Sequence, residues 1–326
     1  MLSQNKNRIA YLSALTLLFS YAEMLLPRFV PFFRLGLGNI AVLLAFDLSL
    51  PSFLLLTIFK AITASLMAGT LFSPFFLISL GQSIVSGFVM YLMATLNSKT
   101  KNRLFSVYGI STAGSAISAL IQIILSSLYL GEGTTALLGP MLIFSIFSGI
   151  LTAVLSQILH IPDKTPDLIR RQNQSSKNKT VIFAILILVA VAAVFMINHL
   201  IILCVAFAAA IILQLISGRK FLILPHLSLW LFVVISCLFV PNGRVLYKIG
   251  NFSITQGALM IGIIKALKLS TATCLSQCAA SLRINGDNFI SLILAYFSGL
   301  NNEMRNTEGN ILQKLKNALS INIIHE

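Results

Sequence analysis

The chain has 326 residues, of which 57% are apolar and only 10% are charged, and its formal net charge is +14. Its mean hydropathy is +0.92. Soluble domains are about 45–50% apolar and about 25% charged, so this composition excludes an ordinary water-soluble domain. The basic residues lie in short loops between apolar runs, a pattern that indicates membrane topology rather than nucleic-acid binding. We therefore predict an all-α, polytopic integral membrane protein without a nucleic-acid partner.

Six apolar runs in the first half approach the roughly 17–25 residues that a helix needs to cross a bilayer. They cover residues 9–26, 36–50, 52–68, 75–95, 105–129 and 138–159. The first run is longer than the apolar core of a signal peptide, which has roughly 7–15 residues, so we predict an uncleaved span. Pro51 separates the second span from the third. Together these runs predict a six-helix membrane domain over residues 1–160.

A polar stretch rich in Asn, Gln, Ser and basic residues follows, and we interpret residues 161–180 as a linker. The apolar runs that follow the linker predict a second membrane domain over residues 181–300. The polar residues after these runs predict a tail over residues 301–326. The whole chain would then hold about ten transmembrane helices in two bundles. The apolar runs of the second domain cover residues 181–197, 199–216, 222–240 and 253–280, and a run at 289–300 is too short to cross alone.

The distribution of basic residues predicts the orientation of these spans. With the N-terminus inside, Lys6, Arg8, the linker and the basic residues within 99–103 and 219–220 all face the cytoplasm. Only a few basic residues, at positions 28, 34, 244 and 248, then face outward. The positive-inside rule therefore favours a multi-pass membrane protein with a cytoplasmic N-terminus, linker and tail. We expect its membrane to be the bacterial cytoplasmic (inner) membrane.

The sequence carries no motif of a soluble enzyme. It has no GxxxxGK[ST] nucleotide-binding loop, no GxSxG and no HExxH. Its nine acidic residues are scattered singly, and its four cysteines lie inside apolar stretches, where free thiols are mostly core residues. We therefore expect no catalytic residue, no metal site and no cofactor in this chain.

Three ionisable residues lie within the predicted spans of the first half, where charge is costly and is usually functional or paired. Asp47 and Lys60 flank Pro51 on neighbouring antiparallel helices, and their depths differ by roughly 6 Å at about 1.5 Å per residue. A lysine side chain can bridge that difference, so we predict a structural Asp47–Lys60 ion pair. The alternative is that Lys60 binds an anionic ligand directly. Glu23 lies nearer the outside and is a candidate contact for a molecule that arrives from there.

Two irregular segments are predicted on the outer face. Residues 34–39, with Gly36 and Gly38, allow close backbone approach or a non-helical entry, and residues 69–74 join the third and fourth spans. Irregular backbone at membrane depth is tolerated where it lines a cavity, although two ordinary turns would give the same pattern. An outward-open pocket at these segments gives the candidate ligand-contacting residues Glu23, Arg34, Asn39, Lys60 and Ser73.

The run Arg34-Leu-Gly-Leu-Gly-Asn39, the run Gly69-Thr-Leu-Phe-Ser-Pro74 and the six-span layout of residues 1–160 together resemble the Gx transporter family. This family is also labelled heptaprenyl diphosphate synthase component I, and it is related to the S components of energy-coupling-factor importers. In S components an Ala-xxx-Ala face on the first helix docks on the transmembrane coupling subunit. The resemblance assigns that role to Ala10 and Ala14, although small residues at this spacing are also a common helix-packing device.

The second half, about residues 180–300, resembles a reduced T component of the same importers. The stretch from Ile254 to Leu269 carries this resemblance. T components grip their ATPases through Ala-Arg-Gly motifs, which this sequence lacks. The resemblance therefore implies partner subunits but leaves coupling to ATP hydrolysis open.

Two functions follow from these resemblances. The first is a membrane transport component that captures a small vitamin-like or hydrophobic solute for uptake, together with membrane or ATPase subunits. The second is a non-catalytic membrane subunit of heptaprenyl or polyprenyl diphosphate synthesis, bound to a soluble prenyl diphosphate synthase subunit. Prenyl transfer needs clustered aspartates that hold magnesium and diphosphate, and the sequence does not cluster them. A membrane scaffold without a ligand is a third hypothesis.

Overall fold

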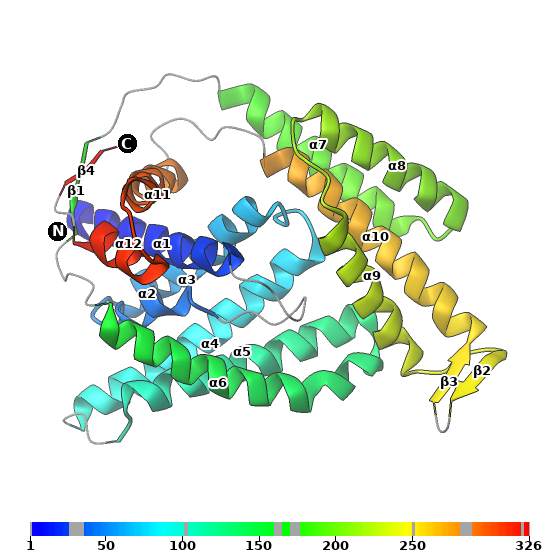
Figure 1. Cartoon of the computed structure of the whole chain (residues 1–326), viewed down its shortest axis with the longest axis horizontal. Helices are drawn as coiled ribbons and strands as arrows, with labels where there is room; N and C mark the ends of the chain where they lie inside the picture. Colours follow the sequence, from blue (N-terminus) through cyan, green and yellow to red (C-terminus); the bar gives the residue numbers. More distant parts are fainter. Residues whose placement is uncertain are drawn as a thin grey trace.

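The computed structural model describes residues 2–25, 36–100, 104–159, 165–169, 177–249, 252–280, 289–320 and 323–325. Helices dominate this part of the chain (Figure 1). In the first half they are α1 (Leu2–Leu25), α2 (Asn39–Leu43), α3 (Leu50–Ala68), α4 (Pro74–Lys99), α5 (Val107–Leu130), the short 3-10 helix η1 (Glu132–Leu137) and α6 (Leu138–Ile158).

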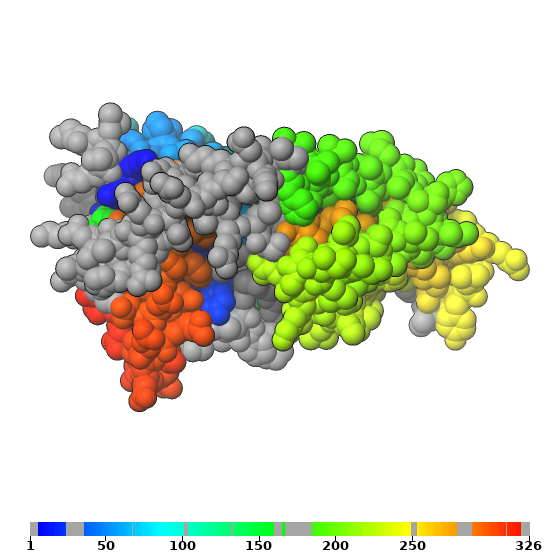
Figure 2. All heavy atoms as spheres, turned by 90° about the horizontal axis from the view of Figure 1, so that it is seen from above, coloured from blue at the N-terminus to red at the C-terminus, as the bar shows by residue number. Residues whose placement is uncertain are grey.

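The second half adds further helices and two small sheets. Its helices are α7 (Lys177–Met196), α8 (Leu200–Ile216), α9 (Ile223–Leu238), α10 (Gln256–Ala280), α11 (Phe289–Asn306) and α12 (Ile311–Leu319). Strand β1 (Asp167–Ile169) pairs in parallel with β4 (Ile323–His325), and β2 (Val245–Ile249) forms an antiparallel hairpin with β3 (Phe252–Thr255). Figure 2 shows this hairpin at the far end of the molecule from α11 and α12.

Several helices have the length and composition of membrane spans. Within the described residues, four helical segments are long and apolar enough to cross a bilayer, namely 74–99, 107–130, 133–158 and 256–278. Large apolar side chains also point outward, since Leu128 is 80% exposed, Ile201 79% and Ile143 73%. A surface of this kind is expected in contact with lipid rather than water. The prediction of an all-α, multi-pass membrane protein is confirmed.

The second predicted span, residues 36–50, is not a continuous helix, and that prediction is wrong. Only Asn39–Leu43 form α2, and turns continue as far as Asp47. The start of this segment meets Glu23 near one end of α1, and Asp47 meets Arg8 near the other end. Glu23 and Arg8 are about 22 Å apart along α1 at 1.5 Å per residue. The segment therefore runs back along α1 as a bent path.

Two glycines shape the start of this segment and its contact with α1. Gly36 has a φ of 69°, in the left-handed region that favours glycine. At Gly38, a Cβ atom would lie 2.8 Å from Ser20 Oγ and 3.3 Å from the carbonyl oxygen of Thr16 on α1. A side chain larger than hydrogen would push the segment away from α1. The close backbone approach that the sequence predicts at these glycines is confirmed.

Helix α11 of the second half packs on the first half. The rings of Tyr296 and Tyr11 meet edge to face with centroids 5.7 Å apart, which joins α11 to α1. The rings of Phe289 and Phe59, with centroids 4.6 Å apart, join α11 to α3. Tyr296 and Tyr11 belong to one buried core, to which Leu315 of α12 also contributes. The short apolar run at 289–300 thus lies against the first bundle.

Two lysines of α10 bond to the ends of other helices. Lys265 Nζ donates to the carbonyl oxygen of Leu130 at the end of α5, at 3.1 Å. Lys268 Nζ donates to the carbonyl oxygen of Phe195 on α7 and to Asn198 Oδ1, at 2.9 and 2.8 Å. The last carbonyls of a helix lack intrahelical partners and carry partial negative charge, so a lysine there is stabilising. Helix α10 thereby bonds to both halves of the chain.

Candidate functional site

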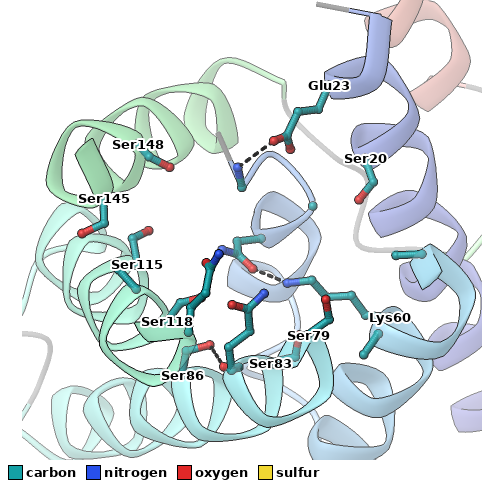
Figure 3. Close-up of a pocket in the computed structure, with 18 of the residues that line it drawn as sticks. Ser20, Glu23, Lys60, Ser79, Ser83, Ser86, Ser115, Ser118, Ser145 and Ser148 are labelled. Carbon is teal, nitrogen blue, oxygen red and sulfur yellow. Dashed lines mark hydrogen bonds between the residues drawn. The ribbon is translucent and has the colours of Figure 1, made fainter. Parts of the chain in front are cut away.

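A cavity of about 130 Å³ lies in the first half, lined by α1, the bent segment around α2 and helices α3 to α6. Figure 3 shows this cavity with the residues that line it. Most of the residues that line it have polar side chains, although the helices around it are apolar overall. The polar side chains are Ser20, Glu23, Asn39, Lys60, Ser79, Gln82, Ser83, Ser86, Ser115, Ser118, Gln122, Ser145 and Ser148.

Lys60 lies at the wall of the cavity on α3. Its Nζ donates a hydrogen bond to Asn39 Oδ1 at the start of α2. The predicted Asp47–Lys60 ion pair is wrong, because Asp47 pairs with Arg8 instead, with Nη2 and Oδ2 2.7 Å apart. The bent segment carries Asp47 past the cavity to the N-terminal end of α1. There its side chain is 54% exposed, and it does not line the cavity.

Glu23 lines the same cavity from α1. Its carboxylate accepts hydrogen bonds from the backbone N–H groups of Gly36 and Leu37, at 3.3 and 3.1 Å. Gly36 turns the chain with its positive φ, so both amides can point at one carboxylate. Glu23 therefore holds the start of the bent segment in place while its side chain lines the cavity (Figure 3).

The structure brings together Glu23, Asn39 and Lys60, three of the residues that the sequence singled out. Arg34 lies outside the described residues. Ser73 does not line the cavity, and its hydroxyl donates to the carbonyl oxygen of Thr70 at 2.7 Å.

The segment 69–74 faces the second half of the chain rather than the cavity. The backbone N–H of Phe72 donates to Ser276 Oγ of α10 at 3.0 Å. Gly69 has a φ of 66°, and a Cβ atom there would lie 2.4 Å from Gln277 Cγ. The prediction that this segment borders the pocket is therefore wrong. It forms a contact between α3, α4 and α10.

The serines of α4, α5 and α6 are the part of the site that the sequence analysis missed. They follow helical spacing with the glutamines, so each set lies on one face of its helix. A polar stripe along an otherwise apolar span is the signal that could have found them. The stripes are residues 79, 82, 83 and 86 on α4, residues 115, 118 and 122 on α5, and residues 145 and 148 on α6.

Some cavity groups act as hydrogen-bond acceptors. The hydroxyl of Ser86 donates to the carbonyl oxygen of Gln82 at 2.6 Å, and that of Ser145 donates to the carbonyl oxygen of Leu142 at 2.7 Å. With their protons used inside the helix, these two oxygens can still accept. Gln82 Oε1 is buried and has no hydrogen-bond partner in the described part of the chain. A buried unpaired acceptor is costly, so a ligand donor or water is expected beside it.

Ala10 and Ala14 are completely buried by the chain itself. They belong to the core that includes Tyr296 and Leu300 of α11. The expectation that they form an exposed face for docking on another subunit is therefore wrong for this structure. Helix packing, the alternative for small residues at this spacing, accounts for their position.

Within the described residues, no group of three or more His, Cys, Asp and Glu side chains is placed to hold a metal ion. His226 and Cys274 approach each other inside the second half, with Nε2 and Sγ 3.8 Å apart. Among the described residues that line the cavity, the acidic side chain is that of Glu23. What this arrangement can do is bind a polar molecule through charge and hydrogen bonds.

Comparison with known proteins gives two family similarities. Residues 178–281 match a domain of unknown function (DUF8519). No curated protein and no solved structure matched the chain. Over residues 12–159, which include the cavity, the chain is similar to the family described as heptaprenyl diphosphate synthase component I.

Proposed function

We propose that residues 1–160 form a membrane domain that captures a small polar solute for uptake. The observation that carries this proposal is the cavity between α1 and α6, whose walls hold a lysine, a glutamate, side-chain amides and many serines. A polar group moved from water to an apolar environment costs on the order of 1–3 kcal/mol when it lacks a partner. A bundle that only had to span the bilayer would fill this space with apolar side chains. A polar ligand would form hydrogen bonds with these polar groups, which would explain why they line the cavity.

The size and polarity of the cavity argue for a small polar solute over a hydrophobic one. An apolar protein cavity of about 150 Å³ holds benzene, and this cavity of about 130 Å³ is comparable. A long prenyl chain matches neither this volume nor this lining. Of the vitamin-like and hydrophobic solutes expected from the sequence, we therefore favour a compact polar molecule.

The second half would support this domain and anchor it to partner membrane or ATPase subunits. Helix α11 packs on α1 and α3 through Tyr11 and Phe59, and both helices also contribute residues to the cavity wall. A partner that moves α11 would therefore act on two walls of the cavity.

A second candidate function rests on the family similarity. The description heptaprenyl diphosphate synthase component I favours a membrane subunit that assists a soluble prenyl diphosphate synthase. The scattered aspartates argue against catalysis by this chain, so the role would be non-catalytic. Co-purification of the intact chain with such a synthase, without any solute uptake that depends on the cavity, would favour this function.

Uptake measurements test the first proposal. Cells that express the wild-type chain should accumulate at least one radiolabelled solute from a panel of small polar molecules. Lys60→Met should reduce this uptake at least ten-fold, because it removes both the cavity cation and its hydrogen bond to Asn39. Lys316→Met on α12, at an exposed position outside the cavity, is the matched control and should leave uptake unchanged. Wild-type uptake by a well-expressed Lys60→Met variant would contradict the proposal.

A further inference from the structure

We propose that the solute is a small zwitterion, with its ammonium group at Glu23 and its carboxylate at Lys60 and Asn39. This inference rests on the proposed function, since it names the substrate class of the same cavity. Among the described lining residues, Glu23 supplies one negative charge and Lys60 one positive charge. A ligand with one charge of each sign and no net charge complements such a lining. A ligand with a single charge could meet only one of these two charges directly.

The Glu23 end is suited to an ammonium group. A carboxylate has about four lone-pair sites, and the N–H groups of Gly36 and Leu37 occupy two of them. These two hydrogen bonds fix the carboxylate in the wall. Within the described residues, no basic side chain forms an ion pair with Glu23. A partly buried carboxylate in a membrane domain favours a cationic partner, and the solute would provide it.

The Lys60 end is suited to a carboxylate. An ammonium group has three donor protons, so Lys60 Nζ can hold Asn39 Oδ1 and also donate to an anionic oxygen. Because Oδ1 of Asn39 accepts from Lys60, its Nδ2 group supplies further donors at the same wall. The pair thus offers a charged donor and a neutral donor side by side, which matches the two oxygens of a carboxylate.

The rest of the lining offers further hydrogen-bond acceptors to a polar solute. The hydroxyl groups of Ser86 and Ser145 donate to carbonyl oxygens of their own helices, so their oxygen atoms remain available as acceptors. Gln82 Oε1 is a buried acceptor for which the described chain supplies no donor. Figure 3 shows Glu23 at the upper edge of the cavity and Lys60 to its right, with the labelled serines of α4 to α6 to the left and below. A zwitterion could therefore lie across the cavity with both charges met.

Thermal unfolding of the purified full-length chain in detergent tests this inference with defined probes. Glycine, β-alanine and γ-aminobutyrate carry both charges at increasing separation. Propionate carries only the carboxylate, propylamine only the ammonium, and glycerol neither. At least one of the zwitterions should raise the Tm, because a ligand that binds the native state stabilises it. The singly charged and neutral probes should bind at least ten-fold more weakly.

Variants separate the two ends of the site. Glu23→Gln removes the charge and keeps one acceptor oxygen, so it retains one of the two hydrogen bonds from the N–H groups of Gly36 and Leu37. It should fold, and it should bind the preferred zwitterion at least ten-fold more weakly. Its binding of propionate should not fall. Glu303→Gln on α11 makes the same chemical change outside the cavity and should bind like the wild type.

Three results would overturn the inference. If glycerol raised the Tm as much as the best zwitterion, or if Glu23→Gln bound that zwitterion like the wild type, the solute class would be wrong while capture of a polar solute survived. If none of the probes raised the Tm and cells showed no uptake that depends on Lys60, the proposed function would fail together with this inference.

Discussion

At the scale of single residues, the backbone path decides which partner each charge meets. Depth along a helix can be estimated from sequence at about 1.5 Å per residue, and that estimate placed Asp47 near Lys60. It could not show that the segment before Pro51 bends and carries Asp47 to Arg8. The alternative prediction, that Lys60 acts at a ligand site, agrees with its position in the cavity wall and stays a prediction.

The Arg8–Asp47 ion pair should contribute little to stability. The side chains are 24% and 54% exposed, and ion pairs at such positions are worth about 0–1 kcal/mol because water and salt screen them. Asp47→Asn should therefore lower the free energy of unfolding by less than about 1 kcal/mol. Denaturant unfolding in detergent at low and high salt measures this effect. A loss several times larger, or one that salt does not change, would contradict a screened pair.

At the scale of elements, apolar length predicts most helices well and fails where polar residues or glycine intervene. The predicted spans at 52–68, 75–95 and 105–129 correspond closely to α3, α4 and α5. Residues 36–50 have a similar apolar content, but Gly36 turns the chain with its positive φ, Gly38 lets the backbone approach α1, and helix α2 ends at Leu43. The serine stripes were equally visible in the sequence, because three- and four-residue spacing defines a helical face.

Gly38 is the position where this bend is most sensitive to mutation. Its backbone is helical, with a φ of −59°, so alanine is allowed locally. Among the described residues, the close contacts of a Cβ atom there are with Ser20 and Thr16 on α1. Gly38→Ala should destabilise the protein by about 1–3 kcal/mol through overpacking. It should also weaken solute binding, since Gly38 lines the cavity.

Gly109→Ala on α5 is the control for this prediction. Among the described residues, a Cβ there would meet Ser106 Oγ at 3.7 Å, an ordinary van der Waals distance. Alanine should be neutral or stabilise the helix by up to about 1 kcal/mol. Both variants can be compared by denaturant unfolding in the same detergent. If Gly38→Ala were as stable as Gly109→Ala, the close approach of the bent segment to α1 would be refuted.

At the scale of the whole molecule, composition alone sufficed for the membrane class, because so few charges cannot cover a water-facing surface. The packing of α11 on α1 could not be predicted in this way. Hydrophobic periodicity shows that Phe289–Asn306 has an apolar face but not which helix covers it. In the structure, the core residues Tyr296 and Leu300 lie against α1 rather than within the second bundle.

This packing predicts that the two halves stay together after the linker is cut. A protease site inserted in residues 170–176 should yield two fragments that co-elute from a sizing column in mild detergent. The ring contact of Tyr11 with Tyr296 and the bond from Lys265 to the Leu130 carbonyl hold the halves independently of the linker. Denaturing gels would verify complete cleavage. Separate elution of the fragments would mean that the linker alone keeps the halves together.

The most direct test of a solute-binding cavity is the identity of small molecules that co-purify with the protein. Mass spectrometry of extracts from the wild-type chain should reveal a compact polar molecule. Ser115→Phe should lose it, because Ser115 lines the cavity and a phenyl ring there would fill the space. Ser127→Phe on the same helix lies outside the cavity and should retain it. An extract with no polar molecule that distinguishes Ser115→Phe from the wild type would contradict the existence of a solute site.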